Sequence, residues 1–261
     1  MKLTRSLAQT FGGKQKAALI AATVVVGFGL GFGVAHLMAG AIAYWGVVSG
    51  PFLISLRVAV PATLIAGITG VASGYALAKG RFPGRNILET IGSLPLILPP
   101  TVIGLYLLQV LSPGTQVGGF LTRLVGHVLV YNVIGCIIVA TVAAYPFCMR
   151  AARAAIEGVD PSVEQAARTM GLPNWRVALL VTLPLARRGI AAGLTIGAAR
   201  ALGEYGATLM VGGDINGKTR TMSLAILDSF TTPERNTMIL ILVLMAISAM
   251  TGVGLLGRTR S

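Results

Sequence analysis

Six apolar windows, each long enough to cross a lipid bilayer, constrain the fold of this sequence more than any other feature. They lie near residues 17–39, 53–78, 90–111, 125–149, 189–211 and 237–257. A helix that rises about 1.5 Å per residue needs about 20 residues to cross roughly 30 Å of hydrocarbon. Because 54% of the residues are hydrophobic and only 11% are charged, a soluble domain is excluded. The sequence predicts an all-α, polytopic membrane helix bundle with about six transmembrane helices, which forms one membrane domain over residues 1–261.

The first window is too long for a cleaved signal peptide, although basic residues precede it. Its apolar core exceeds twenty residues, whereas the apolar region of a signal peptide spans 7–15 residues. Residues 17–39 are therefore predicted to form an additional, uncleaved transmembrane helix.

The basic residues predict the orientation of the chain. With the N-terminus in the cytoplasm, fifteen Lys and Arg residues fall inside and four fall outside, and Arg57 and Arg200 lie within apolar windows. Positive charge accumulates on the cytoplasmic side of membrane proteins. Both termini are thus predicted to be cytoplasmic. The net charge of +13 is explained by this topology and by contact with the bilayer, and it does not indicate nucleic-acid binding.

A short amphipathic helix is predicted in the longest charged loop, residues 150–188. Asp160 can cap it, Pro161 suits its first position and Gly171 can end it. Four small or apolar residues share one face at helical spacing, opposite the polar face that carries Glu164: they are Val163, Ala166, Ala167 and Met170. Such a helix can dock in a groove on another protein, and the alternative is an ordinary amphipathic surface helix.

At these residues the chain resembles the permease subunits of ATP-binding-cassette (ABC) importers. Their cytoplasmic loop carries Glu-Ala-Ala, three residues, Gly, nine residues, Ile, one residue and Leu-Pro. The corresponding residues here are Gln165, Ala166, Ala167, Gly171, Val181, Leu183 and Pro184. Two of them depart from the pattern: Gln165 replaces glutamate, with Glu164 one place earlier, and Val181 replaces isoleucine.

Further segments resemble the molybdate importer permeases in particular. They are residues 81–85, 96–104, 151–161, 200–208 and 217–224, so the resemblance covers roughly residues 52–257. It implies a type I ABC importer permease fold in a bacterial cytoplasmic membrane, with residues 52–257 as the core and residues 150–188 as its coupling loop. The implied function is import of a tetrahedral oxyanion by alternating access, with molybdate as the first substrate. Tungstate and sulfate, whose permeases are close relatives, are the alternatives.

The resemblance also implies partners and coupling residues. The partners are two copies of a cytoplasmic ATPase subunit, a second copy of the permease and an extracytoplasmic binding protein that delivers the oxyanion. The residues implied to couple the permease to its ATPase are Glu164, Gln165, Ala166, Ala167, Met170, Gly171, Leu183 and Pro184.

The third window contains three prolines, at positions 95, 99 and 100, which prevent a straight helix because proline lacks a backbone N–H. Broken helix inside a membrane requires protein or water around it. Pro99, Pro100 and Thr101 are therefore candidates to line the transport pathway. The alternative is a kink that only shapes packing.

The fifth window contains Arg200 and Glu204, which are four residues apart and are predicted to pair on one helix face. Ionisable residues at membrane depth usually face protein or water. They, together with Thr208, are candidates for a gate, and the alternative is a structural ion pair. Gly189, Gly193 and Gly197 form a stripe that allows close helix packing, either within the bundle or across a dimer.

Two other classes of function are alternatives. A proton-coupled anion carrier would use Glu204 as its titrating group. An intramembrane enzyme is disfavoured because the windows contain no Ser/His pair, HExxH motif or paired aspartates, and no cofactor or metal site is expected around Cys136 and Cys148. Residues 212–219 match the phosphate-loop pattern, but they follow a membrane helix on the outer side. The chain is therefore expected to have no ATPase site of its own.

Overall fold

The computed structural model describes residues 45–228 and 233–256. The predicted helix at 17–39 lies outside these residues. The elements described below belong almost entirely to one compact unit of the chain, which begins at Val47. The described residues form helices and short connections, without a strand among them, which confirms the all-α prediction.

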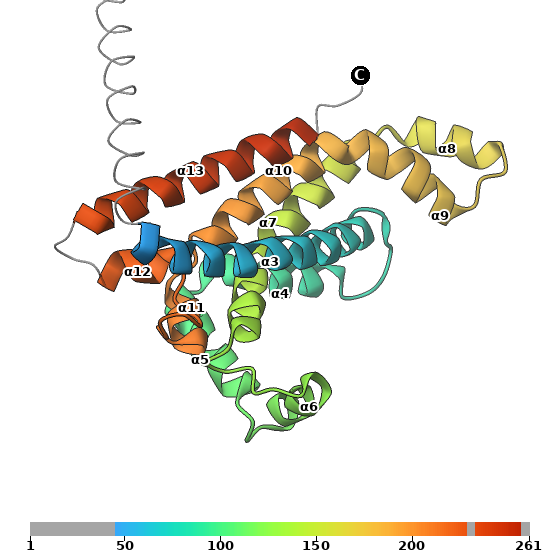
Figure 1. Cartoon of the computed structure of the whole chain (residues 1–261). Helices are drawn as coiled ribbons and strands as arrows, with labels where there is room; N and C mark the ends of the chain where they lie inside the picture. The colour runs from blue at the N-terminus through green and yellow to red at the C-terminus, as the bar shows by residue number, and fades with distance from the viewer. Residues whose placement is uncertain (1–44, 229–232, 257–261) are drawn as a thin grey trace, which may run out of the picture. The chain divides into compact units, whose positions relative to one another are not determined.

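Figure 1 shows the helices in chain order. They are α3 (Trp45–Lys79), α4 (Arg85–Ile97), α5 (Pro100–Leu111), α6 (Gln116–Val125), α7 (Val133–Glu157), α8 (Pro161–Thr169), α9 (Asn174–Val177), a π-helical segment (Ala178–Thr182), α10 (Leu183–Leu202), α11 (Gly206–Gly212), α12 (Met222–Asp228) and α13 (Pro233–Leu256).

Several of these helices are long and apolar enough to cross a membrane. Among the described residues they are Gly46–Lys79, Val133–Glu157 and the continuous helix Asn174–Leu202. Helices α4 and α5 meet the same criterion only together and are bent by 115° at their junction, as in a broken span or a re-entrant loop. Helix α13 contains a shorter apolar stretch, Arg235–Thr251. The multi-pass membrane prediction is therefore confirmed for this part of the chain.

Two of the predicted windows do not coincide with single helices. The fourth, 125–149, is wrong at its start, because Gly126 and Tyr131 adopt positive φ angles of 76° and 56° and α7 begins only at Val133, capped by the Asn132 side chain. The fifth, 189–211, is interrupted after Leu202, where α10 ends.

Helix α7 lies between two glycine-bearing helices. A Cβ atom added at Gly189 would lie 2.5 Å from Ala155 Cβ, and one added at Gly197 would lie 2.7 Å from Cys148 Sγ. On α3, a Cβ atom at Gly70 would lie 2.7 Å from Cys148 Cβ. The glycines therefore allow α3 and α10 to approach α7 at backbone distance. Of the two interfaces considered for the glycine stripe, packing within the bundle is the one observed.

Candidate coupling loop and gate

Helix α8 begins and ends where the sequence predicts. Asp160 Oδ1 accepts a hydrogen bond from the Ser162 backbone N–H at 2.8 Å, and hydrogen bonds from Ser162 lower the pKa of Asp160. At the other end Gly171 adopts φ 88°, and the N–H groups of Gly171 and Leu172 donate to the carbonyls of Arg168 and Ala167 at 2.9 and 3.3 Å. This pair of bonds is a Schellman motif, which needs a residue with positive φ and so explains the glycine.

An apolar stripe runs along the exposed surface of α8, beside exposed polar side chains. Val163 is 43% exposed and Met170 is 77% exposed, and Ala166 is exposed between them. Ala167, predicted on the same face, is instead buried against the rest of the loop. Trp175 in the first turn of α9 is 60% exposed, and the Arg176 guanidinium lies 5.1 Å from its ring centroid. Sequence reasoning missed this tryptophan, although a large aromatic residue in a charged loop was an available signal.

Glu164 points into the protein rather than toward solvent. The residue is 4% exposed; its Oε1 atom lies 2.9 Å from Lys79 Nζ and accepts a hydrogen bond from Thr182 Oγ1 at 2.7 Å. Burial raises the pKa of this carboxyl, but the hydrogen bonds from Lys79 and Thr182, with the charges of Lys79 and Arg168, outweigh burial and lower the pKa overall. The prediction that Glu164 lies on the outer polar face of α8 is therefore wrong. The polar partners of Glu164 are Lys79 and Thr182, which lie in distant parts of the chain.

Leu183 and Pro184 follow a widened helical turn. The Leu183 N–H donates to the Ala178 carbonyl, five residues back, as in a π-helix. Pro184 has no N–H and its ring conflicts with the carbonyl four residues earlier, so the wider turn accommodates it. Leu183 is half-buried and Pro184 is exposed.

Two interrupted helices meet at a second site. One interruption lies between α4 and α5 at Leu98 and Pro99, and the other lies between α10 and α11 at residues 203–205. A Cβ atom added at Gly206 would lie 3.3 Å from both Pro100 Cβ and Thr101 Cγ2. We call this contact of α4–α5 with α10–α11 the paired breaks. Pro99, Pro100 and Thr101 are exposed on the surface of the chain, whereas Thr208 is buried in α11.

Arg200 and Glu204 form the predicted ion pair, but not on one helix. The distance from Arg200 NH1 to Glu204 Oε2 is 2.5 Å. Because α10 ends at Leu202, Glu204 lies in the connection, and its Oε1 accepts the Ala207 N–H at 2.9 Å at the start of α11. Its Oε2 atom faces the Arg200 guanidinium, so its two oxygen atoms have different partners. The backbone carbonyl of Glu204 accepts the Ser223 hydroxyl of α12 at 3.0 Å.

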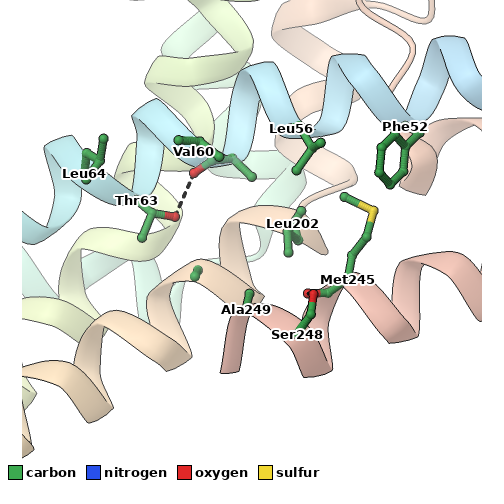
Figure 2. Close-up of a pocket in the computed structure, with 11 residues that line it drawn as sticks. Phe52, Leu56, Val60, Thr63, Leu64, Leu202, Met245, Ser248 and Ala249 are labelled. Carbon is green, nitrogen blue, oxygen red and sulfur yellow. Dashed lines mark hydrogen bonds between the residues drawn. The ribbon is translucent and has the colours of Figure 1, made fainter. Parts of the chain in front are cut away.

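A cavity of about 420 Å³ lies between α3, α10 and α13, as Figure 2 shows. Its lining is almost entirely apolar and includes Phe52, Leu202 and Met245. Its two hydroxyl groups are used locally, since Thr63 donates to the Ala59 carbonyl at 2.7 Å and Ser248 donates to the Met245 carbonyl at 2.9 Å. An oxyanion needs convergent donors, so this cavity does not suit one.

The glycine-rich segment at 212–219 lacks the setting of a phosphate loop. Helix α11 precedes it, whereas a phosphate loop follows a strand. Thr219 Oγ1 accepts the Ile215 N–H at 3.1 Å, which closes a turn within the segment. Arg220 beside it pairs with Asp214 at 2.8 Å and with Asp228 at 3.0 Å.

The helices and the two sites define a class of protein: a multi-pass helical membrane protein with interrupted helices and an exposed amphipathic helix in a loop. Residues 66–258 match the family described as "Binding-protein-dependent transport system inner membrane component". The chain belongs to this family of transport permeases.

Individual relatives agree with this assignment. The chain is 39% identical over 181 residues to the molybdenum transport system permease protein ModB of Escherichia coli K12, an alignment that covers 69% of this chain and 79% of that protein. It is 37% identical over 180 residues to ModB of Haemophilus influenzae, covering 69% and 79%. It is 31% identical over 188 residues to the sulfate transport system permease protein CysT of E. coli K12, covering 70% and 68%.

Solved structures support the fold. The inward-facing MetNI methionine ABC transporter matches with a TM-score of 0.66 at 18% identity, covering 84% of this chain and 99% of that chain. An amino acid ABC transporter crystallised with histidines matches with a TM-score of 0.58 at 16% identity, covering 84% and 96%. The predicted importer permease fold is thereby confirmed.

Proposed function

We propose that this chain is the membrane-spanning permease subunit of an ATP-driven importer for a tetrahedral oxyanion, with molybdate as its main substrate. The observation that carries the proposal is α8, a capped helix with an exposed apolar stripe in the loop whose spacing matches importer permeases. The relatives named for molybdenum and sulfate transport support the substrate class. Tungstate and sulfate are the alternative substrates, because they share the tetrahedral shape and the charge.

In this proposal the energy comes from separate subunits. Two copies of an ABC ATPase bind the coupling loops of a permease homodimer, and the permease has no ATPase site of its own. The outward face of α8, with Gln165, Ala166, Met170 and Gly171, lies against the ATPase. The positive-inside distribution supports cytoplasmic termini and a cytoplasmic α8 in the bacterial inner membrane. An extracytoplasmic binding protein selects the anion and delivers it to the opposite side.

The paired breaks are the proposed gate. Interrupted helices at membrane depth suit a site that rearranges, because their backbone polar groups require protein or water around them. Pro99 lies in one break, and Pro100 and Thr101 open the helix after it. Glu204 lies in the other break, between Arg200 in the last turn of α10 and Thr208 in α11. Closure of the ATPase dimer would displace the coupling helices and shift this region between two arrangements, provided that the partners bind the two states differently.

Competition in proteoliposomes tests the substrate. The chain is reconstituted with its cognate ATPase and binding protein, and uptake of radiolabelled molybdate is measured with internal ATP. Unlabelled molybdate and tungstate should compete at lower concentrations than sulfate. If sulfate competes as well as molybdate, the substrate assignment is wrong; if uptake needs a proton gradient and no ATPase, the carrier alternative holds.

A further inference from the structure

The buried carboxylate of Glu164 joins three segments that are distant in sequence. Lys79, in the last turn of α3, lies 85 residues before it and donates to Oε2 at 3.0 Å. The Lys79 side chain is 24% exposed and that of Glu164 is 6% exposed. The end of a 35-residue membrane helix is thus fixed to a short helix that has only nine residues.

Thr182 provides the third part of this contact. Its hydroxyl is buried and donates to Glu164 Oε1 at 2.7 Å. Thr182 ends the π-helical segment and leads directly into α10. The 20 residues of α10 span about 30 Å, and its last turn carries Arg200, the ionic partner of Glu204 at the paired breaks. One carboxylate therefore links α8 to α3 and to the helix that reaches the gate.

Helix α8 has other connections that act locally. It follows α7 through residues 158–160, of which Val159 is buried, and Ala167 is buried on its inner side. Arg168 lies 3.9 Å from Glu164 Oε2 with its own side chain half-exposed. A buried carboxylate holds its partners firmly, because losing one partner leaves a charge without compensation in a place with little water. Displacement of α8 therefore acts on the ends of α3 and α10 through Glu164.

We propose that Lys79, Glu164 and Thr182 form a tether that transmits displacement of α8 to α3 and α10 together. Lys79 and Thr182 are positioning residues, since they act through Glu164 and not on the substrate. The inference rests on the proposed function, because it assumes that an ATPase moves α8. It assigns the transmission to three side chains inside the permease, separate from the surface that touches the ATPase.

The test is the number of ATP molecules hydrolysed per anion imported by the reconstituted complex. Lys79→Gln removes the cation and should raise this ratio about fivefold, near the size expected for losing a hydrogen bond between charged groups that is partly exposed. Lys79→Arg keeps the charge and should restore a ratio close to that of the parent. Thr182→Val removes one hydrogen bond and should give an intermediate ratio.

The Arg85–Glu157 pair supplies the matched control. It lies at 3.1 Å between α4 and α7, and Glu157 keeps Arg153 as a second partner at 2.8 Å. Arg85→Gln therefore removes one cation from the same region without touching Glu164, and it should leave the ratio unchanged. The double variant Lys79→Gln/Glu164→Gln should be no worse than Lys79→Gln, because both changes break one tether.

The two hypotheses fail in different ways. If the parent complex shows no ATP-dependent uptake, the proposed function fails. If the parent transports but Lys79→Gln and Thr182→Val keep its ratio, or Arg85→Gln raises the ratio equally, the tether is refuted. Should Lys79→Gln not assemble with the ATPase, Thr182→Val decides, since it removes only a hydroxyl.

Discussion

The contact between α5 and α11 at the paired breaks leaves no room for a methyl group, which makes Gly104→Ala a sharp perturbation. A Cβ atom at Gly104 would lie 2.6 Å from Ala207 Cα, 2.9 Å from Met210 Cβ and 3.1 Å from the Ala207 carbonyl oxygen. Carbon atoms prefer a separation of about 3.5 Å or more, so the helices must part by about 0.9 Å. Two of the three obstructing atoms are backbone, which cannot move alone. Overpacking of this kind costs about 1–3 kcal/mol in the free energy of unfolding.

The assay compares thermal unfolding and ATP-driven uptake for Gly104→Ala and Gly114→Ala. No heavy atom lies within 4 Å of a Cβ atom at Gly114, so this variant controls for the glycine replacement itself. We expect Gly104→Ala to lower the Tm and to reduce uptake, and Gly114→Ala to change neither by a comparable amount. If the two variants behave alike, α5 and α11 do not pack as closely as described, and the paired breaks cannot be a defined gate.

Three further predictions concern the coupling loop, the ion pair and the helix packing. Gly171→Asp should abolish ATP-driven uptake while the protein still inserts into the membrane. Gly171→Asn adds no charge and tolerates the φ of 88°, because asparagine is sometimes found at this position of a helix end, so it should retain more uptake. Equal uptake by Gly171→Asp and the parent would contradict the docking role. Arg200→Gln should destabilise the protein by about 1–3 kcal/mol, less than a fully buried pair would lose because the Arg200 side chain is 30% exposed. In thermal unfolding, the double variant Arg200→Gln/Glu204→Gln should lose less stability than Arg200→Gln alone, because it leaves no unpaired charge. Equal losses of stability in the two variants would argue against the ion pair. Gly193→Val should lower the Tm more than Ile196→Val on the exposed side of α10, since a Cβ atom at Gly193 overlaps Ala151 of α7.

Local chemistry made several features predictable from the sequence. The ends of α8 follow from Asp160, Pro161 and Gly171, because capping depends on neighbouring residues. The bend between α4 and α5 follows from prolines that cannot donate backbone hydrogen bonds. The role of Gly189 and Gly197 as packing positions follows from their helical spacing.

Features that depend on distant contacts were not predictable in this way. The helical spacing puts Glu164 on the polar face of α8, but its burial depends on Lys79, which is 85 residues away. The apolar window 189–211 continues past Leu202 and so gives no sign that α10 ends there. Gly203 and Gly206, which lie beside Glu204, are a signal that could have indicated the interruption. The contact of Gly206 with Pro100 joins segments about a hundred residues apart, and amphipathic patterns carry no information about such pairs.

The central claim is that a cytoplasmic ATPase drives this permease through α8. The most direct test is to identify which energy source drives anion uptake. Anion uptake should be measured in proteoliposomes that contain the chain and its binding protein, with and without the cognate ATPase, under internal ATP or under an imposed pH gradient. The account predicts uptake only when ATPase and ATP are both present, with no response to the pH gradient alone. Uptake that follows the pH gradient without the ATPase, and that disappears in Glu204→Gln, would contradict it.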